Sequence, residues 1–186
     1  RDSYLYRSLA GGWYGDIMPD LFDRLSTAAR PYEIAVGRVI EEKSSLQYEE
    51  DDTSMDYDVK MIDANGQHLT VEVKVHAGIN TYNNKPYDTL CLEVKEYQYK
   101  HNRYVLSHWM KSNFDVMAHV DKHKGEIHLY KGSTIREWAL ARRHNARYST
   151  KVKTANLTIP WRHKEAGYIT TLSFTEQHIT QDGQER

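Results

Sequence analysis

Two carboxylates and one lysine occupy neighbouring segments in which polar and apolar residues alternate. Asp58 lies at the start of the first segment, and Glu72 and Lys74 lie in the second. Carboxylate oxygens are the ligands that Mg²⁺ prefers, and a nearby ammonium group can orient a water molecule or neutralise developing negative charge. These residue types are the ones needed for metal-dependent hydrolysis of a phosphodiester bond.

The alternation predicts a β-hairpin formed by residues 57–62 and 68–75. A two-residue turn at Asn65 and Gly66 would mix acidic and apolar side chains on one face. A three-residue loop with Gly66 in the left-handed conformation instead places Asp58 opposite Glu72 and gathers the valines on the other face. The apolar pattern therefore favours the three-residue loop.

The hairpin residues resemble the PD-(D/E)xK, or restriction-endonuclease-like, nucleases. The resemblance lies in Tyr57-Asp58-Val59 and Val71-Glu72-Val73-Lys74-Val75. It implies that Asp58, Glu72 and the backbone carbonyl of Val73 hold Mg²⁺ or Mn²⁺, and that Lys74 assists catalysis. Tyr57 stands where the name of the motif has proline, which makes the match less specific.

Two further acidic residues are candidate metal ligands. The resemblance implies a glutamate on the preceding helix, and Glu33 occupies a comparable place. Glu93 belongs to a second Glu-x-Lys tripeptide, on a strand predicted for residues 89–95. If that strand adjoins the strand of residues 68–75, then Glu93 shares the polar face with Glu72. The sequence leaves both candidates open.

The net charge of −1 argues against a protein that coats nucleic acid by bulk electrostatics, but the charge is uneven. An acidic run covers residues 49–52, and a basic stretch covers residues 131–153. The candidate DNA-binding cations are Lys85, Lys95, Arg136, Arg142 and Arg143. Tyrosines lie among basic residues at Tyr82, Tyr87, Tyr97, Tyr99 and Tyr104 and suit either base stacking or ordinary packing.

Several short strands between helices predict an α/β fold, with a mixed central β-sheet flanked by helices and a restriction-endonuclease-like core. The expected organisation is an N-terminal extension with a short helix (1–30), a nuclease-like domain (31–176) and a flexible tail (177–186). A helix is predicted to begin at Pro31. A capping-box pattern at Thr134 and Glu137 predicts a second, basic helix that extends to about Arg147.

The single cysteine, Cys91, excludes an intramolecular disulfide and favours a reducing compartment, so we expect a cytoplasmic location. No apolar run is long enough to span a bilayer, and no membrane role is expected. The spacing of His119 and His123 does not suit a metal site, because the two residues fall on a strand and on the turn after it.

The expected activity is that of a Mg²⁺- or Mn²⁺-dependent deoxyribonuclease, an endonuclease acting on double-stranded or branched DNA. A homodimer would suit cleavage of both strands. The segment from Ser107 to Asp115 resembles phage and viral members of the superfamily, which implies a phage-encoded protein in a bacterial host. The alternative is a non-catalytic module on the same fold that binds nucleic acid or protein.

Overall fold

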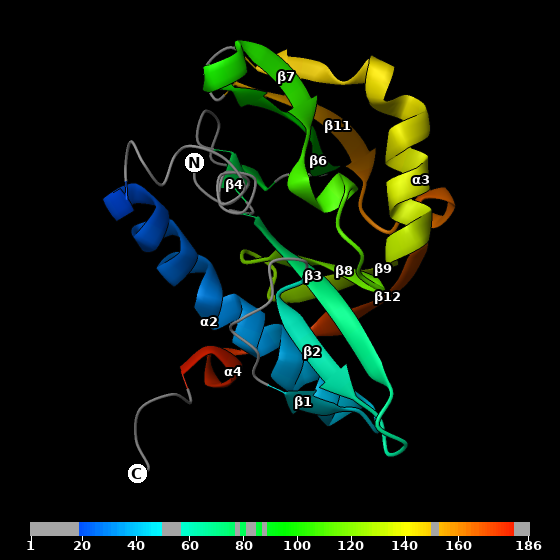
Figure 1. The fold of residues 1–186 in the computed structure, drawn as a ribbon. Helices are drawn as coiled ribbons and strands as arrows, with labels where there is room; N and C mark the ends of the chain where they lie inside the picture. The colour runs from blue at the N-terminus through cyan, green and yellow to red at the C-terminus, as the bar shows by residue number, and fades with distance from the viewer. Residues whose placement is uncertain are drawn as a thin grey trace.

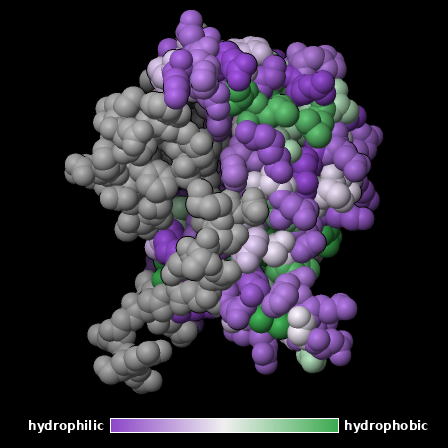
Figure 2. Space-filling model, in the orientation of Figure 1, coloured by the Kyte–Doolittle hydropathy of each residue, from purple (hydrophilic) through white to green (hydrophobic). Residues whose placement is uncertain are grey.

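The computed structural model describes residues 19–49, 57–76, 79–80, 85–86, 89–149 and 153–180. These residues form a mixed α/β structure with two main sheets (Figure 1). The glycines of the N-terminal extension, most of the acidic run, Tyr82, Tyr87 and residues 181–186 lie outside the described residues. The described residues on the face drawn in Figure 2 are mainly hydrophilic, with small separate hydrophobic patches among them.

The larger sheet has six strands in the order β1-β2-β3-β8-β9-β12. It is mixed, because β3 and β8 are parallel whereas the other neighbouring pairs are antiparallel. This confirms the expected mixed sheet. The strands are β1 (Gln47–Glu49), β2 (Val59–Ile62), β3 (His68–His76), β8 (Val116–Asp121), β9 (Glu126–Lys131) and β12 (Tyr168–Ser173).

The register of the β2–β3 hairpin agrees with the sequence argument. Val59 pairs with Val71, and Met61 pairs with Leu69. Gly66 has φ of 76°, and the backbone nitrogen of Asp63 donates to the carbonyl oxygen of Gln67 at 3.0 Å, so the loop between them has three residues. The valines of both strands consequently lie on one face.

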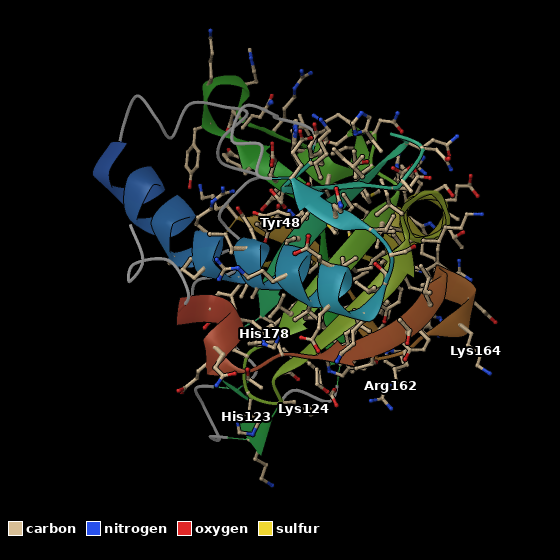
Figure 3. All side chains as sticks on the ribbon, turned by 90° about the horizontal axis from the view of Figure 1, so that it is seen from below. Tyr48, His123, Lys124, Arg162, Lys164 and His178 are labelled. Carbon is tan, nitrogen blue, oxygen red and sulfur yellow. The ribbon has the colours of Figure 1, made fainter. Side chains whose placement is uncertain are left out.

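The apolar face of the larger sheet packs against the helix α2 (Pro19–Lys43). Figure 3 shows this helix lying across the strands, with His178 of the short helix α4 (Glu176–Thr180) beside it. The core between helix and sheet includes Val36, Val39, Ile40, Val59, Met61, Val71, Val73, Val75, Val116, Ala118, Val120, Ile127 and Leu129.

Pro31 lies inside α2, so the predicted helix start at this residue is wrong. Proline within a helix removes one backbone donor and crowds the preceding turn. The helix continues because the turns that follow bury Val36, Val39 and Ile40 against the sheet, and such burial stabilises a helix more than local propensity does.

The second sheet has four antiparallel strands in the order β10-β11-β6-β7. These are β10 (Arg147–Ser149), β11 (Thr154–Pro160), β6 (Thr89–Gln98) and β7 (Arg103–Leu106); β4 (Ile79–Asn80) and β5 (Lys85–Pro86) form a separate pair. The expectation that β6 could adjoin β3 is wrong, because β8 occupies that position. Strand order depends on the whole chain, and local periodicity does not determine it.

A second core lies between the two sheets and the helix α3 (Gly132–Arg142). It includes Leu90, Leu92, Val94, Trp109, Met117, Tyr130, Ile135 and Ala139. The helix begins at Gly132, two residues before the predicted capping box, and its N-terminus has no side-chain cap. A Cβ on Gly132 would lie 2.4 Å from the carbonyl oxygen of Phe114, and this close approach fixes where the helix starts.

Short 3₁₀ turns complete the described structure: η1 (Tyr99–His101), η2 (His108–Met110), η3 (Arg143–Asn145) and η4 (Lys164–Ala166). The basic helix thus ends at Arg142 and is followed by η3, earlier than expected. Part of the predicted tail is helical, because α4 packs beside α2 and Arg38 Nη1 donates to the carbonyl oxygen of His178 at 3.2 Å. Among the described residues, no helix has the length and apolar character needed to cross a bilayer.

Candidate active site

Asp58 directly precedes β2 and hydrogen-bonds to the β3 residues on either side of Glu72. The backbone nitrogen of Asp58 donates to the carbonyl oxygen of Val71 at 2.9 Å, although Val71 is already the register partner of Val59, so Asp58 lies just outside the regular ladder. The backbone nitrogen of Val73 donates to Asp58 Oδ2 at 2.6 Å. This hydrogen bond orients the Asp58 carboxylate towards the backbone between Glu72 and Lys74.

Both carboxylates are buried. Asp58 is 3% exposed and Glu72 is 1% exposed. An ordinary solvent-exposed sheet face would leave such residues in water, so the face of the hairpin that carries Asp58 and Glu72 is not of this kind. Burying a carboxylate is costly unless cations or hydrogen bonds compensate for lost hydration, so the fold must offset a local concentration of negative charge.

Lys74 supplies a positive charge at this position. Its Nζ lies 2.6 Å from Glu72 Oε1, and the exposed side-chain fractions are 13% for Lys74 and 2% for Glu72. Residues two apart on a strand point to the same face, which is why the Glu-x-Lys spacing brings the two groups together. The ion pair is shielded from solvent much more than a surface pair.

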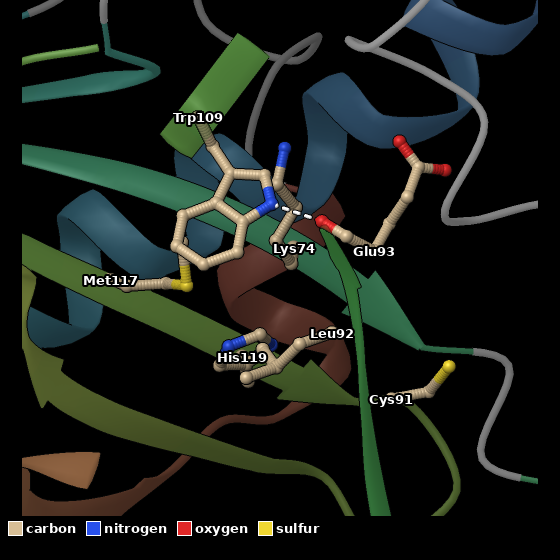
Figure 4. A pocket seen from close by; sticks show the side chains of 7 residues that line it. All are labelled: Lys74, Cys91, Leu92, Glu93, Trp109, Met117 and His119. Carbon is tan, nitrogen blue, oxygen red and sulfur yellow. Dashed lines mark hydrogen bonds between the residues drawn. The ribbon is translucent and has the colours of Figure 1, made fainter. Parts of the chain in front are cut away.

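Glu93 reaches the same region from the second sheet. Together with Lys74 and His119 it lines a narrow pocket between the two sheets (Figure 4). Ser107 Oγ donates to Glu93 Oε1 at 3.1 Å, and Trp109 Nε1 donates to the backbone carbonyl oxygen of Glu93 at 2.6 Å. Glu93 thus lies near Lys74 although β6 and β3 belong to different sheets.

Cys91 borders the same pocket. Burial, and secondly the negative charge of Glu93, raise the pKa of the Cys91 thiol to about 12. A thiol with such a pKa is protonated at neutral pH and is a poor nucleophile, so we assign no chemical role to Cys91.

Glu33 lies on α2 and is 6% exposed. Arg30 Nη1 lies 3.5 Å from Glu33 Oε2, one helical turn earlier. The structure therefore places Glu33 in a buried position with a cationic neighbour. Its role as a metal ligand stays a prediction.

The donor set at Asp58 and Glu72 fits a magnesium ion that keeps much of its water. Within the part of the chain that the structure describes, no three His, Cys, Asp or Glu side chains converge as a metal site. Mg²⁺ commonly uses only one or two carboxylates, with water and substrate phosphate as its other ligands. The buried carboxylates of Asp58 and Glu72 supply that number of ligands.

Buried histidines occupy the same face of the sheet as Glu72 and Lys74. His119 pairs with Lys74 across β8 and β3, and its Nδ1 lies 2.8 Å from His76 Nε2. His119 Nε2 has no hydrogen-bond partner among the described residues. The sequence argument missed the His76–His119 pair because it considered neighbours along the chain, although a parallel β3–β8 register would have revealed it.

The environment of these histidines favours their neutral form. Burial, and secondly the charge of His128, lower the pKa of His76 to about 3. Burial also lowers the pKa of His119 well below its ordinary value, with His76 and Lys74 as the next causes. The Lys74 ammonium thus lies close enough to His119 to oppose its protonation.

The five candidate DNA-binding cations are dispersed. Lys85 is exposed on β5, and Lys95 Nζ donates to the hydroxyl of Tyr148 at 3.0 Å. The other three belong to α3 and the turn after it: Arg136 lies over the Phe114 ring, Arg142 lies over the Trp138 ring, and Arg143 Nη1 donates to the carbonyl oxygen of Leu140 at 2.6 Å. The arginine side chains thus also serve local packing.

Comparison of the chain with protein-family models, with curated proteins and with solved structures found no match.

Proposed function

We propose that the chain is a Mg²⁺- or Mn²⁺-dependent deoxyribonuclease of the PD-(D/E)xK type with a restriction-endonuclease-like core. The single observation that carries the proposal is the burial of Glu72, which is ion-paired with Lys74, and of Asp58, which hydrogen-bonds to the residues on either side of Glu72. Burying carboxylates costs free energy that hydrogen bonds, a neighbouring cation or a bound metal ion must offset, and such buried groups are typical of functional sites.

Each residue has a definite role in this proposal. Asp58 and Glu72, with the carbonyl of Val73, hold the metal ion, and Glu33 or Glu93 completes the site. The ion, when bound, polarises the phosphate and lowers the pKa of a bound water. Lys74 orients the attacking water or neutralises the charge that develops on the phosphate.

The proposed reaction is endonucleolytic cleavage of double-stranded or branched DNA, and a two-fold dimer would suit cleavage of both strands. A non-catalytic binding module on the same fold is the second candidate. It is favoured by the finding that no third metal-ligating side chain joins the two carboxylates within the described residues.

A cleavage assay tests the proposal. The protein is incubated with plasmid, linear, single-stranded and branched DNA, with Mg²⁺, with Mn²⁺ or with EDTA. Asp58→Asn, Glu72→Gln and Lys74→Met are expected to lose cleavage by at least about 100-fold, because removing a preorganised electrostatic group from an active site commonly has effects of this size.

Matched controls use the same chemical changes at exposed positions. Glu137→Gln on α3 and Lys164→Met on η4 remove one exposed carboxylate and one exposed ammonium, and we expect both variants to cut as the unmodified chain does. The nuclease proposal would be abandoned if no DNA is cut with either metal. If the control variants lose as much cleavage activity as the hairpin variants, the catalytic roles of Asp58, Glu72 and Lys74 would be rejected.

A further inference from the structure

Four tyrosines form a continuous row of rings on the second sheet, which we call the tyrosine ladder: Tyr99, Tyr97, Tyr104 and Tyr148. The ring centroids of successive members are 5.1, 5.1 and 4.8 Å apart. The register explains the row, because Tyr97 pairs with Tyr104 across β6 and β7, and Tyr148 pairs with Ala155, which in turn pairs with Lys95.

The two ends of the ladder are exposed. Tyr99 is 44% exposed and Tyr148 is 54% exposed, and among the described residues Ile169 is the one other large apolar residue with comparable exposure. Aromatic rings gain more by being buried than by facing water. Exposed rings at both ends of an organised row therefore indicate a surface that is covered by a ligand.

Cations surround these rings. Lys153 Nζ lies 4.6 Å from the ring centroid of Tyr97 and 4.8 Å from that of Tyr99, and Lys95 Nζ lies 5.5 Å from that of Tyr148. Together, residues 95–104, 147–149 and 153 hold five Lys or Arg residues and one acidic residue, in a chain whose net charge is −1.

The acidic residue points away from the ladder. Glu96 lies between Lys95 and Tyr97 on β6, and successive side chains of a strand point to opposite faces. Glu96 Oε2 is accordingly buried. The ladder face therefore combines exposed aromatic rings with positive charge, which is the combination that binds unpaired bases and their phosphates.

The ladder lies on the same strand as the candidate active-site residue Glu93. Lys95 and Tyr97 share one face of β6, and the β6–β11 register is irregular between Glu93 and Lys95. Tyr97 lies four positions after Glu93, which corresponds to about 13 Å of extended chain. A strand of DNA lying on the ladder would thus pass close to the pocket that Glu93 and Lys74 line.

We propose that the tyrosine ladder binds a single-stranded segment of DNA and that the substrate is consequently branched DNA with an unpaired arm. The proposed binding surface is argued from the ring and cation contacts of the ladder alone, whereas its use in substrate selection rests on the proposed nuclease function. Unpaired bases present their faces for stacking on tyrosine rings, but the bases of a duplex are already stacked on each other. The ladder therefore discriminates in favour of unpaired strands.

Fluorescence anisotropy in EDTA tests binding without cleavage. The probe is a labelled oligonucleotide of about 16 nucleotides, at the upper end of known site sizes, and the duplex of the same sequence is measured beside it. Tyr99→Ala and Tyr148→Ala are each expected to weaken binding of the single strand by about 5- to 150-fold, the loss of one stacked base. Arg103→Gln is expected to lower the slope of log K against log salt by about 0.7.

Two controls separate stacking from other effects. Ile169→Ala removes an equally exposed apolar side chain on β12, and Tyr148→Phe keeps the ring; both are expected to leave the dissociation constant within about twofold. Equal binding by Tyr148→Ala and Ile169→Ala, or tighter binding of the duplex than of the single strand, would overturn the proposal. A ladder that instead served a protein partner would give this result.

The outcome is independent of the nuclease test. Glu137→Gln, which neutralises an exposed carboxylate on α3, is expected to bind the single strand as the unmodified chain does. If no DNA is cut but the ladder variants bind the single strand more weakly than the unmodified chain, the proposed nuclease function is wrong and the proposed binding surface is supported. If DNA is cut but the ladder variants bind and cut as before, the binding surface fails alone.

Discussion

Replacing Lys74 by methionine should destabilise the fold more than neutralising its partner Glu72. The Lys74→Met variant keeps a similar side-chain length but removes the cation that lies 2.6 Å from the nearly inaccessible Glu72 carboxylate. Removing one partner of a buried ion pair costs roughly 3–5 kcal/mol. For a chain of this size, that loss lowers the melting temperature by about 6–20 °C.

Glu72→Gln should cost less, because Lys74 is 13% exposed and can hydrate its charge. The double variant Glu72→Gln/Lys74→Met should recover part of the stability that Lys74→Met loses. A hydrogen bond to a charged group contributes about 1.5–3 kcal/mol, and we expect a coupling energy between Glu72 and Lys74 in that range.

The surface pair Lys60–Glu49 provides the matched control. Its Nζ–Oε2 distance is 2.5 Å, but its side chains are 21% and 45% exposed. Exposed pairs contribute about 0–1 kcal/mol, so the same double-mutant cycle should give a smaller coupling at this site. The comparison isolates burial, because both pairs have close contacts between lysine and glutamate.

Urea denaturation in EDTA, followed by tryptophan fluorescence, measures both cycles. Trp109 lines the pocket beside Lys74 and reports on the unfolding of this region. A coupling of the Glu72–Lys74 pair no larger than that of the surface pair would refute the argument that the Glu72 carboxylate depends on Lys74 in the fold.

Three further predictions concern protons, cations and packing. Because burial depresses the pKa of His76 to about 3 and that of His119 well below its ordinary value, the unfolded chain binds protons at acidic pH that the native state does not. The free energy of unfolding should therefore be constant above pH 6.5 and decrease as the pH is lowered from 6.5, by about 1.4 kcal/mol per pH unit for each histidine. Denaturation of His76→Gln at several pH values should show a shallower decrease. Mn²⁺ at about 100 times its dissociation constant should stabilise the chain by about 2.7 kcal/mol, and a thermal scan should show no such shift for Asp58→Asn or Glu72→Gln. Gly132→Ala should lower the denaturation midpoint by an amount equivalent to about 1–3 kcal/mol, since its Cβ would lie 2.4 Å from a backbone oxygen; an unchanged midpoint would show that α3 can shift without penalty.

The sequence predicted the parts of the fold that depend on neighbouring residues. The hairpin register follows from alternation and from a loop whose Gly66 adopts positive φ, and both features are encoded within about twenty residues. The helix around Pro31 was placed wrongly at its start, because burial against the sheet overrides the local preference of proline. The sequence pattern does not predict the strand β1, since three residues are too few to establish a period.

The candidate site shows the same division. The sequence by itself determined that Glu72 and Lys74 share a face, because side-chain direction alternates along a strand, and the contact between Lys74 Nζ and Glu72 Oε1 confirms it. A direct pairing of Asp58 with Glu72 stays a prediction, because the hairpin register ends at Val59 and Asp58 hydrogen-bonds to the residues on either side of Glu72. Only the tertiary structure decided that this face is buried, since a second sheet from later in the chain covers it and brings Glu93 to Lys74. Burial depends on contacts between strands far apart in sequence, and the periodicity of a single strand does not specify what packs against it.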